Sequence, residues 1–348
     1  MNYRGNTIGE IGSEFYVESS QKGRNEYISL VNYPKRYVLS GRTGLYLIAS
    51  ELKTKNISSV AMPAYCCGSM VAPFVDAGFE VSFYEDDSVQ KAEAILIMDY
   101  FGFVRKETVA FAHKCYEAGK KIIVDATQTA FSRSNSYLYA DYIVVSYRKW
   151  SDCLCAAVYS KNGFITDEYK KTNKEYVETW KLAAKKKKIF LEAGVGEKQD
   201  FLDLYAKANH MLAEKYIGYA ASNSEIELFE NLDSTFIRNS RRENAKVLID
   251  SLSQIIEMMF TQLSDADCPL HVPIILNPEE RARIRKILIQ KSIYCPCHWP
   301  IDEQFPYQRT LNHDRELSLI CDQRYMKKDM IREVESVIYA INKEDIGK

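Results

Sequence analysis

The sequence predicts an α/β protein, with a mostly parallel sheet covered by helices and a smaller C-terminal α+β domain. Two observations predict this fold. Between about residues 40 and 160, short apolar runs alternate with helical patterns, which is typical of β–α units. After Asp265 a second β-α-β-α pattern follows. The 348 residues suffice for two domains, and we expect an N-terminal segment 1–35, a large domain 36–240 and a small domain 241–348.

Six apolar runs are the expected strands of the large domain. Most are continuously apolar, as expected when helices cover both faces of a parallel sheet. They are Ser59–Met62, Glu80–Tyr84, Ala94–Met98, Lys121–Val124, Tyr142–Val145 and Ala156–Ser160. The helices predicted between them are Thr43–Leu52, Ser69–Ala77 and Lys106–Ala118, the last of which is followed by Gly119, a common residue at helix ends.

The second half of the chain is predicted to be helical first and mixed afterwards. Apolar residues recur at helical spacing from about 165 to 260, for example from Ile237 to Met259. Four elements are expected after this stretch. They are a strand His271–Leu276, a helix Pro278–Lys291 that begins with proline, a strand Ser292–Trp299 and a helix Lys328–Asn342.

Charge and composition exclude several classes of protein. The 46 Lys+Arg and 47 Asp+Glu residues nearly cancel, so no global positive field would attract nucleic acid or a membrane surface. The run Lys185–Lys188 is interpreted as a solvated helix face. The sequence shows no signal peptide or spanning helix, and its nine cysteines are an odd number. We therefore expect a cytoplasmic protein with reduced thiols.

Three segments at expected strand ends or helix starts carry residues suited to chemistry. Ser40-Gly41-Arg42-Thr43-Gly44 precedes a helix and suits a phosphate, although Ser40 could be a plain helix cap. Asp125 follows an apolar strand, where its carboxylate could meet a cation or cap a turn. Lys149 follows another strand, beside Arg148 and among aromatic residues. It is either a nucleophilic amine or an exposed loop lysine.

The order of these segments favours one chemistry. A phosphate-binding helix start, a strand-end aspartate and a strand-end lysine are the parts that a pyridoxal phosphate enzyme requires. The lysine forms a Schiff base, and the aspartate pairs with the pyridinium nitrogen. The sequence has no dinucleotide-binding glycine motif or phosphate-binding Walker loop to compete with this interpretation.

The sequence also resembles a known family, the DegT/StrS group of sugar-aminotransferase-like, fold-type-I pyridoxal-phosphate enzymes, over about residues 36–345. Five motifs in order carry the resemblance, namely Ser40–Leu47, Met62–Cys66, Asp125–Gln128, Ser146–Trp150 and Leu317–Tyr325. The resemblance implies a homodimer with a seven-stranded type of sheet and bound pyridoxal 5′-phosphate. It also implies transfer of an amino group from an amino acid, expected to be glutamate, to a keto sugar or similar carbonyl compound.

The resemblance assigns roles to individual residues. Lys149 would form the Schiff base and carry the proton, while Asp125 would keep the pyridine nitrogen protonated. Gln128 would lie near the cofactor hydroxyl, and Tyr65 would stack on the ring or belong to the core. The expected phosphate site contains Ser40, Gly41, Arg42, Thr43 and Ser146, and the candidate substrate residues are Tyr100, His298, Trp299, Arg309 and Arg324.

Some features depart from the family pattern and leave alternatives open. The polar and cysteine-containing segment Ser151–Cys155 replaces a glycine-rich turn, and the segment expected to reach the partner subunit is hard to recognise around Tyr219–Arg242. The same parts could serve elimination or another lyase reaction, or a regulatory protein on a degenerate fold. The pairs Cys153/Cys155 and Cys295/Cys297 lack the spacing of a zinc site, so no metal is predicted.

Overall fold

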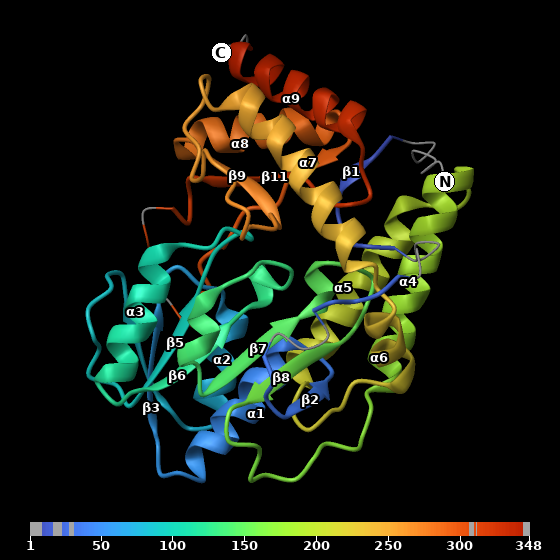
Figure 1. Ribbon diagram of the computed structural model, residues 1–348. Coiled ribbons are helices and arrows are strands. Elements are labelled where there is room, and N and C mark those ends of the chain that lie inside the picture. Colours follow the sequence, from blue (N-terminus) through green and yellow to red (C-terminus); the bar gives the residue numbers. More distant parts are fainter. Residues whose placement is uncertain (1–8, 17–22, 28–30, 306–309, 311, 344–348) are drawn as a thin grey trace.

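The computed structural model describes residues 9–16, 23–27, 31–305, 310 and 312–343 (Figure 1). Its main sheet has seven strands in the order β2-β8-β7-β6-β5-β3-β4, and β8 alone runs antiparallel to its neighbours β7 and β2. The strands are β2 (Lys35–Val38), β3 (Ser59–Pro63), β4 (Glu80–Tyr84), β5 (Ala94–Met98), β6 (Lys121–Asp125), β7 (Tyr142–Ser146) and β8 (Ala156–Ser160). The predicted α/β fold is confirmed, with each of the six predicted strands correct to within one residue.

Helices cover both faces of this sheet, because alternate strand residues are apolar on each side. On β5, Leu96 packs in the same core as α1 (Gly41–Lys53) and α2 (Gly68–Asp76). Its neighbours Ile95 and Ile97 pack in the core beneath α3 (Lys106–Glu117). These are the three helices predicted for this part of the chain.

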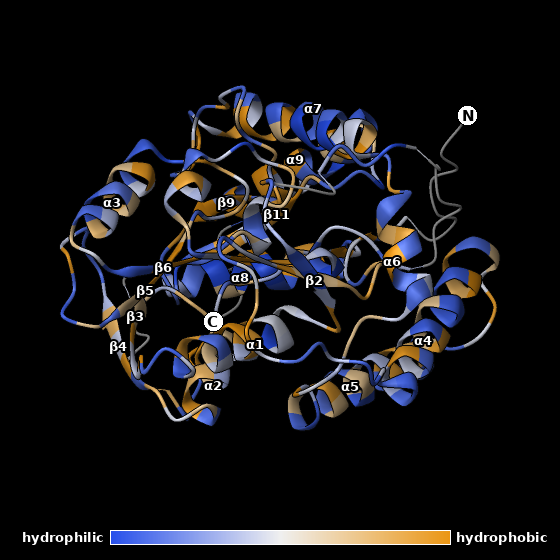
Figure 2. Ribbon diagram, turned by 60° about the horizontal axis from the view of Figure 1, so that its bottom comes forward, coloured by the Kyte–Doolittle hydropathy of each residue, from blue (hydrophilic) through white to orange (hydrophobic). Residues whose placement is uncertain are grey.

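A helical hairpin follows the sheet, made of α4 (Lys174–Ala193) and α5 (Lys198–Glu214) (Figure 1). Its two helices pack through rings such as Trp180 and Tyr205, whose centroids lie 4.8 Å apart. The helices carry hydrophobic residues on one side and hydrophilic residues on the other (Figure 2). Within the described ranges, no helix is long and apolar enough to cross a bilayer.

Two more helices lead to the smaller part of the molecule. After α6 (Asn223–Glu230), α7 (Ser234–Leu252) runs from the sheet toward this part (Figure 1). Its sheet pairs β9 (His271–Ile275) antiparallel with β11 (Glu316–Ile320), beside α8 (Pro278–Gln290) and α9 (Lys327–Asn342). The expected domain boundary at residue 240 falls inside α7, so one helix belongs to both parts.

The predicted strand Ser292–Trp299 is wrong over most of its length. Only β10 (Ile293–Tyr294) forms there, and the strand beside β9 is β11, which was not predicted. Pro296 and Pro300 provide no backbone N–H group, so this stretch cannot continue a strand ladder. The strand therefore ends at Tyr294.

An N-terminal segment crosses from the small domain to the helical hairpin. Its strand β1 (Ile11–Gly12) pairs in parallel with β10, with Ile11 opposite Ile293. The next residues are held by the hairpin. Lys187 Nζ donates to the carbonyl of Glu14 at 2.7 Å, and the Tyr205 hydroxyl donates to the carbonyl of Phe15 at 2.9 Å.

Candidate functional site

A cavity of about 880 Å³ lies at the carboxyl ends of the parallel strands. The start of α1 and the ends of β6 and β7 form one wall, while α5 and residues 13–15 form another. The small domain contributes residues that follow β10 and β11. Since open α/β sheets bind ligands at this edge, the topology brings the three predicted segments together.

The start of α1 forms a tight backbone cradle. Ser40 caps the helix, because its Oγ accepts a hydrogen bond from the backbone N–H of Thr43 at 3.2 Å. A side chain at Gly41 would place its Cβ 3.1 Å from Ser146 Cβ and 3.8 Å from Thr127 Oγ1. Glycine therefore lets the helix N-terminus, with its free N–H groups, approach the end of β7. The predicted cap and the predicted cradle are both present.

Two arginines flank this cradle without a carboxylate partner among the described residues. The Arg42 guanidinium lies 5.4 Å from the ring centroid of Tyr216, and the Arg148 guanidinium lies 4.8 Å from that of Trp180. Arg148 Nη1 also donates to Asn209 Oδ1 at 3.3 Å. Burial lowers the pKa of Arg42. Two half-buried cations beside a helix N-terminus suit a doubly charged anion such as a phosphate.

Asp125 ends β6 inside the cavity wall and is 5% exposed. Its Oδ1 accepts a hydrogen bond from the backbone N–H of Thr127 at 2.8 Å, so the aspartate does cap the following turn. Burial raises the pKa of this carboxyl group. In the described part of the chain, no lysine or arginine forms an ion pair with it. A bound cation would therefore complete the site.

Lys149 ends a short 3₁₀ turn, Tyr147–Lys149, which follows β7. Its side chain lines the cavity and is exposed there. Burial lowers the pKa of the amine, and the neighbouring Arg148 lowers it further. No described residue forms a hydrogen bond or ion pair with Nζ. A lowered pKa favours the neutral form of an amine, which is its nucleophilic form.

The segment after the lysine is packed rather than glycine-rich. The backbone N–H of Leu154 donates to Glu225 Oε2 at 2.6 Å, and Lys181 lies 3.2 Å from Glu225 Oε1. Cys153 and Cys155 are buried beside it. Among the residues that the structure describes, no group of three or more histidine, cysteine or acidic side chains could hold a metal ion.

Other predicted residues also line the cavity. Gln128 accepts a hydrogen bond from the backbone N–H of Phe101 through Oε1 at 2.6 Å. His298 and Trp299 reach the cavity from the small domain, where His298 Nδ1 lies 2.9 Å from Ser318 Oγ. The cofactor contact of Gln128 and the substrate contacts of His298 and Trp299 stay predictions.

Three predicted residues do not contribute to the described cavity wall. The Tyr65 hydroxyl donates to the carbonyl of His298 at 2.6 Å, and its ring packs on Trp299 with centroids 5.0 Å apart. The Tyr100 hydroxyl donates to the carbonyl of Tyr65 at 2.9 Å. Thr43 is fully buried, and its Oγ1 donates to the carbonyl of Tyr216. The Tyr65 ring therefore packs against Trp299 and Tyr100, and its contact with a cofactor stays a prediction.

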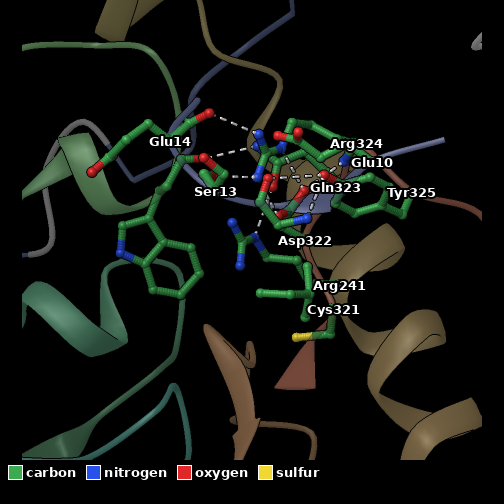
Figure 3. A network of polar contacts seen from close by, with 12 residues as sticks. Glu10, Ser13, Glu14, Arg241, Cys321, Asp322, Gln323, Arg324 and Tyr325 are labelled. Carbon is green, nitrogen blue, oxygen red and sulfur yellow. Dashed lines mark hydrogen bonds and ion pairs between the residues drawn. The ribbon is translucent and has the colours of Figure 1, made fainter. Parts of the chain in front are cut away.

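The two predicted substrate arginines have different outcomes. Arg309 lies outside the described residues. Arg324 lies on the cavity wall and makes two hydrogen bonds to Asp322, at 2.9 Å from Nε and 2.8 Å from Nη2 (Figure 3). It also donates to the carbonyls of Ser13 and Glu14, both at 3.1 Å (Figure 3). Its guanidinium therefore ties the N-terminal segment to the small domain.

Several cavity residues were not predicted. Thr127 is part of the Asp125–Gln128 motif, so its place beside the cradle could have been inferred from the sequence. Asn209, Glu14 and His271 come from α5, the N-terminal segment and β9, and no local pattern in these elements signals a site.

Comparisons with known proteins agree with the fold. No protein-family model and no curated protein matches the sequence. Among solved structures, the aminotransferase TlmJ from Streptoalloteichus hindustanus matches with a TM-score of 0.64 and 13% identity, over 96% of this chain and 99% of that one. Helicobacter pylori PseC, an aminotransferase involved in the biosynthesis of pseudoaminic acid, matches with a TM-score of 0.64 and 14% identity, over 95% and 99%.

A third solved structure adds a cofactor to the comparison. NtdA from Bacillus subtilis, with bound cofactor PMP, matches with a TM-score of 0.62 and 15% identity, over 89% of this chain and 73% of that one. At these identities the matches establish the fold. The chain has the α/β fold of these aminotransferases along nearly its whole length.

Proposed function

We propose that this chain is a pyridoxal-phosphate-dependent aminotransferase. In this proposal an amino acid, expected to be glutamate, donates the amino group, and a keto sugar or similar carbonyl compound accepts it. One observation carries the proposal: one cavity holds a lysine and a buried aspartate that form no ion pair with any described residue, together with a glycine-based cradle flanked by two arginines. The matched structures support it, because TlmJ and PseC are aminotransferases and NtdA binds the cofactor PMP.

The residues fit this cofactor at each of its polar groups. The N–H groups at the start of α1, together with Ser146, Arg42 and Arg148, would hold the phosphate. Asp125 would bind the protonated pyridine nitrogen, which supplies the cation that its buried carboxylate lacks. Gln128 would lie near the ring hydroxyl. When bound, pyridoxal phosphate withdraws electrons from the substrate carbon that loses a proton.

The remaining chemistry belongs to Lys149. Burial and the nearby Arg148 lower the pKa of its amine, which favours the neutral, nucleophilic form. Lys149 would hold the aldehyde group of the cofactor, with release of water, and once displaced by the donor amine it would accept a proton from the donor carbon. Asp125 would keep the ring nitrogen protonated. A homodimer and a cytoplasmic location remain predictions from the sequence.

Absorption spectroscopy with chemical trapping tests the proposal. Protein mixed with pyridoxal phosphate should absorb near the edge of the visible range, and borohydride should fix the adduct on Lys149. Lys149→Ala should abolish the fixed adduct. Lys198→Ala is the control, because Lys198 lines the same cavity but is held by Glu10 Oε2 at 2.8 Å. If wild-type protein yields no fixed adduct, the enzyme proposal is refuted.

Addition of substrates separates the reaction types. A donor amino acid should bleach the visible band and release its oxo acid, and a carbonyl acceptor should restore the band. Nucleotide-linked and free keto sugars can be screened in this way. Loss of the donor's carboxyl group or of a side-chain group, without formation of the oxo acid, would indicate a lyase.

A further inference from the structure

Trp150 follows Lys149 and is completely buried, with hydrogen bonds on two sides. Its indole Nε1 donates to the carbonyl of Thr127 at 2.8 Å. Its own carbonyl accepts a hydrogen bond from Gln323 Nε2 at 2.7 Å. The Arg241 guanidinium lies 4.6 Å from the centroid of its ring. Trp150 is therefore fixed in both backbone and side chain.

The partners on one side of Trp150 come from α7 and from the small domain. Gln323 follows β11, and Arg241 lies in α7 (Figure 3). Arg241 Nε donates to Gln323 Oε1 at 2.8 Å (Figure 3). Its Nη1 donates to the carbonyl of Leu270 at 3.0 Å. All three side chains are at least 96% buried, since Gln323 is 4% exposed, Arg241 1% and Trp150 0%. Their arrangement is consequently rigid.

The partner on the other side belongs to the loop that carries Asp125. Thr127 accepts the hydrogen bond of the Trp150 indole through its carbonyl group. Its backbone N–H donates a hydrogen bond to Asp125 Oδ1. The backbone N–H of Ser146 donates to Thr127 Oγ1 at 3.2 Å, which joins this loop to the end of β7. Trp150 thus connects the turn that carries Lys149 with the loop that carries Asp125.

We propose that Trp150, held by Arg241 and Gln323, is a positioning residue that fixes Lys149 relative to Asp125 and transmits the placement of the small domain to the lysine. Nothing in the described chain binds Lys149 Nζ, so the backbone of its turn sets the position of the amine. Trp150 closes that turn through its backbone N–H, which donates to the carbonyl of Tyr147 at 2.8 Å. The catalytic meaning of this link rests on the proposed function, whereas the link itself does not.

The link can be tested through the reactivity of the Lys149 amine in the full-length protein freed of cofactor. Competitive labelling with acetic anhydride across a pH range, followed by mass spectrometry, reports the apparent pKa of this amine. Gln323→Leu removes the hydrogen bond to the Trp150 carbonyl. A loosened turn lets the amine move away from Arg148 and further into water, so its apparent pKa should rise and its labelling at neutral pH should fall by about 3- to 10-fold. An unchanged labelling profile would overturn the proposal.

Asn244→Leu is the matched control. Asn244 is a buried amide on the same helix as Arg241, and its Nδ2 donates to the carbonyls of Asp322 and Tyr325 at 3.1 and 3.0 Å. It anchors the chain after β11 without a hydrogen bond to Trp150. This variant should leave the labelling of Lys149 unchanged. If Asn244→Leu and Gln323→Leu slow the labelling of Lys149 equally, the small domain has loosened as a whole. This result would also overturn the proposal.

A second variant approaches Trp150 directly. Trp150→Phe keeps a ring beneath Arg241 but removes the N–H that binds Thr127, and it should slow labelling of Lys149 in the same direction. This covers the case in which Gln323→Leu does not fold. The assay needs no cofactor, so its result is independent of borohydride trapping. Failure to trap an adduct refutes the proposed function, while normal labelling of Trp150→Phe refutes the link.

Discussion

Glu333 provides a quantitative prediction about stability. It lies in α9 and is 0% exposed. Its Oε1 accepts hydrogen bonds from the backbone N–H of Ile320 at 2.9 Å and from Cys295 Sγ at 3.4 Å, while Oε2 has no hydrogen-bond partner in the structure as described. Burial raises the pKa of this carboxyl group to about 8, so it is protonated at neutral pH.

The raised pKa links stability to pH. In the unfolded chain the group ionises near its ordinary pKa of 4.5, whereas in the folded chain it holds its proton up to about pH 8. The stabilisation is therefore present at acidic pH and lost as the pH rises through this window. The free energy of unfolding falls by about 1.4 kcal/mol per pH unit, or about 2.7 kcal/mol over two units within the window.

Glu333→Gln removes this dependence but keeps the shape of the side chain and its Oε1 acceptor. Relative to wild type, the variant should gain about 2.7 kcal/mol between about pH 5.5 and pH 7.5, with no further gain above the folded pKa. Urea unfolding followed by circular dichroism at several pH values measures the difference.

The control is Glu335→Gln, which changes an exposed glutamate on the same helix. It should follow the wild-type dependence on pH. If the free energies of wild type and Glu333→Gln run parallel across the whole window, the buried carboxyl group is already ionised at neutral pH. The reasoning from its burial would then be refuted.

Three further predictions concern the site. Gly41→Ala places a Cβ 3.1 Å from Ser146 Cβ and should weaken pyridoxal phosphate binding about 10-fold in a fluorescence titration, with the melting temperature unchanged. If wild type and variant bind the cofactor with equal affinity, the phosphate does not bind at Gly41. Asp125→Asn cannot keep the ring nitrogen protonated, so kcat should fall about 100-fold or more in steady-state assays while borohydride still fixes an adduct on Lys149; full activity would remove Asp125 from the proposal. Tyr65→Phe removes the hydrogen bond to the carbonyl of His298 and should lower the free energy of unfolding by about 1 kcal/mol in urea titrations, without changing the affinity for the cofactor. A large loss of cofactor affinity would instead place Tyr65 at the cofactor.

The sequence predicts the strand-end part of the site well. Asp125, Ser146 and Lys149 follow runs that can only be buried strands, and parallel strands bring their carboxyl ends to one edge. The order of the motifs along the chain is therefore enough to place these residues in one cavity. The glycine at position 41 could be predicted for the same reason, since a helix start at that edge must come close to the next strand end.

Parts of the site that depend on tertiary packing were beyond such reasoning. The chain turns after β3 so that the Tyr65 ring packs on Trp299, and no local pattern fixes that direction. Arg324 has a carboxylate partner two residues away, at Asp322, which satisfies it internally. Asn209 reaches the cavity because of how the helical hairpin docks, and its own surroundings in α5 resemble those of any exposed helix face.

The N-terminal segment has a consequence for biosynthesis. Ile11 pairs with Ile293, so this stretch is synthesised long before its strand partner. Contacts of such long sequence separation form slowly, and the sheet domain can fold well before them. A nascent chain would thus carry Asp125 and Lys149 on a folded sheet while one wall of the cavity is still missing. Competence to retain a ligand should arise only after the small domain has left the ribosome.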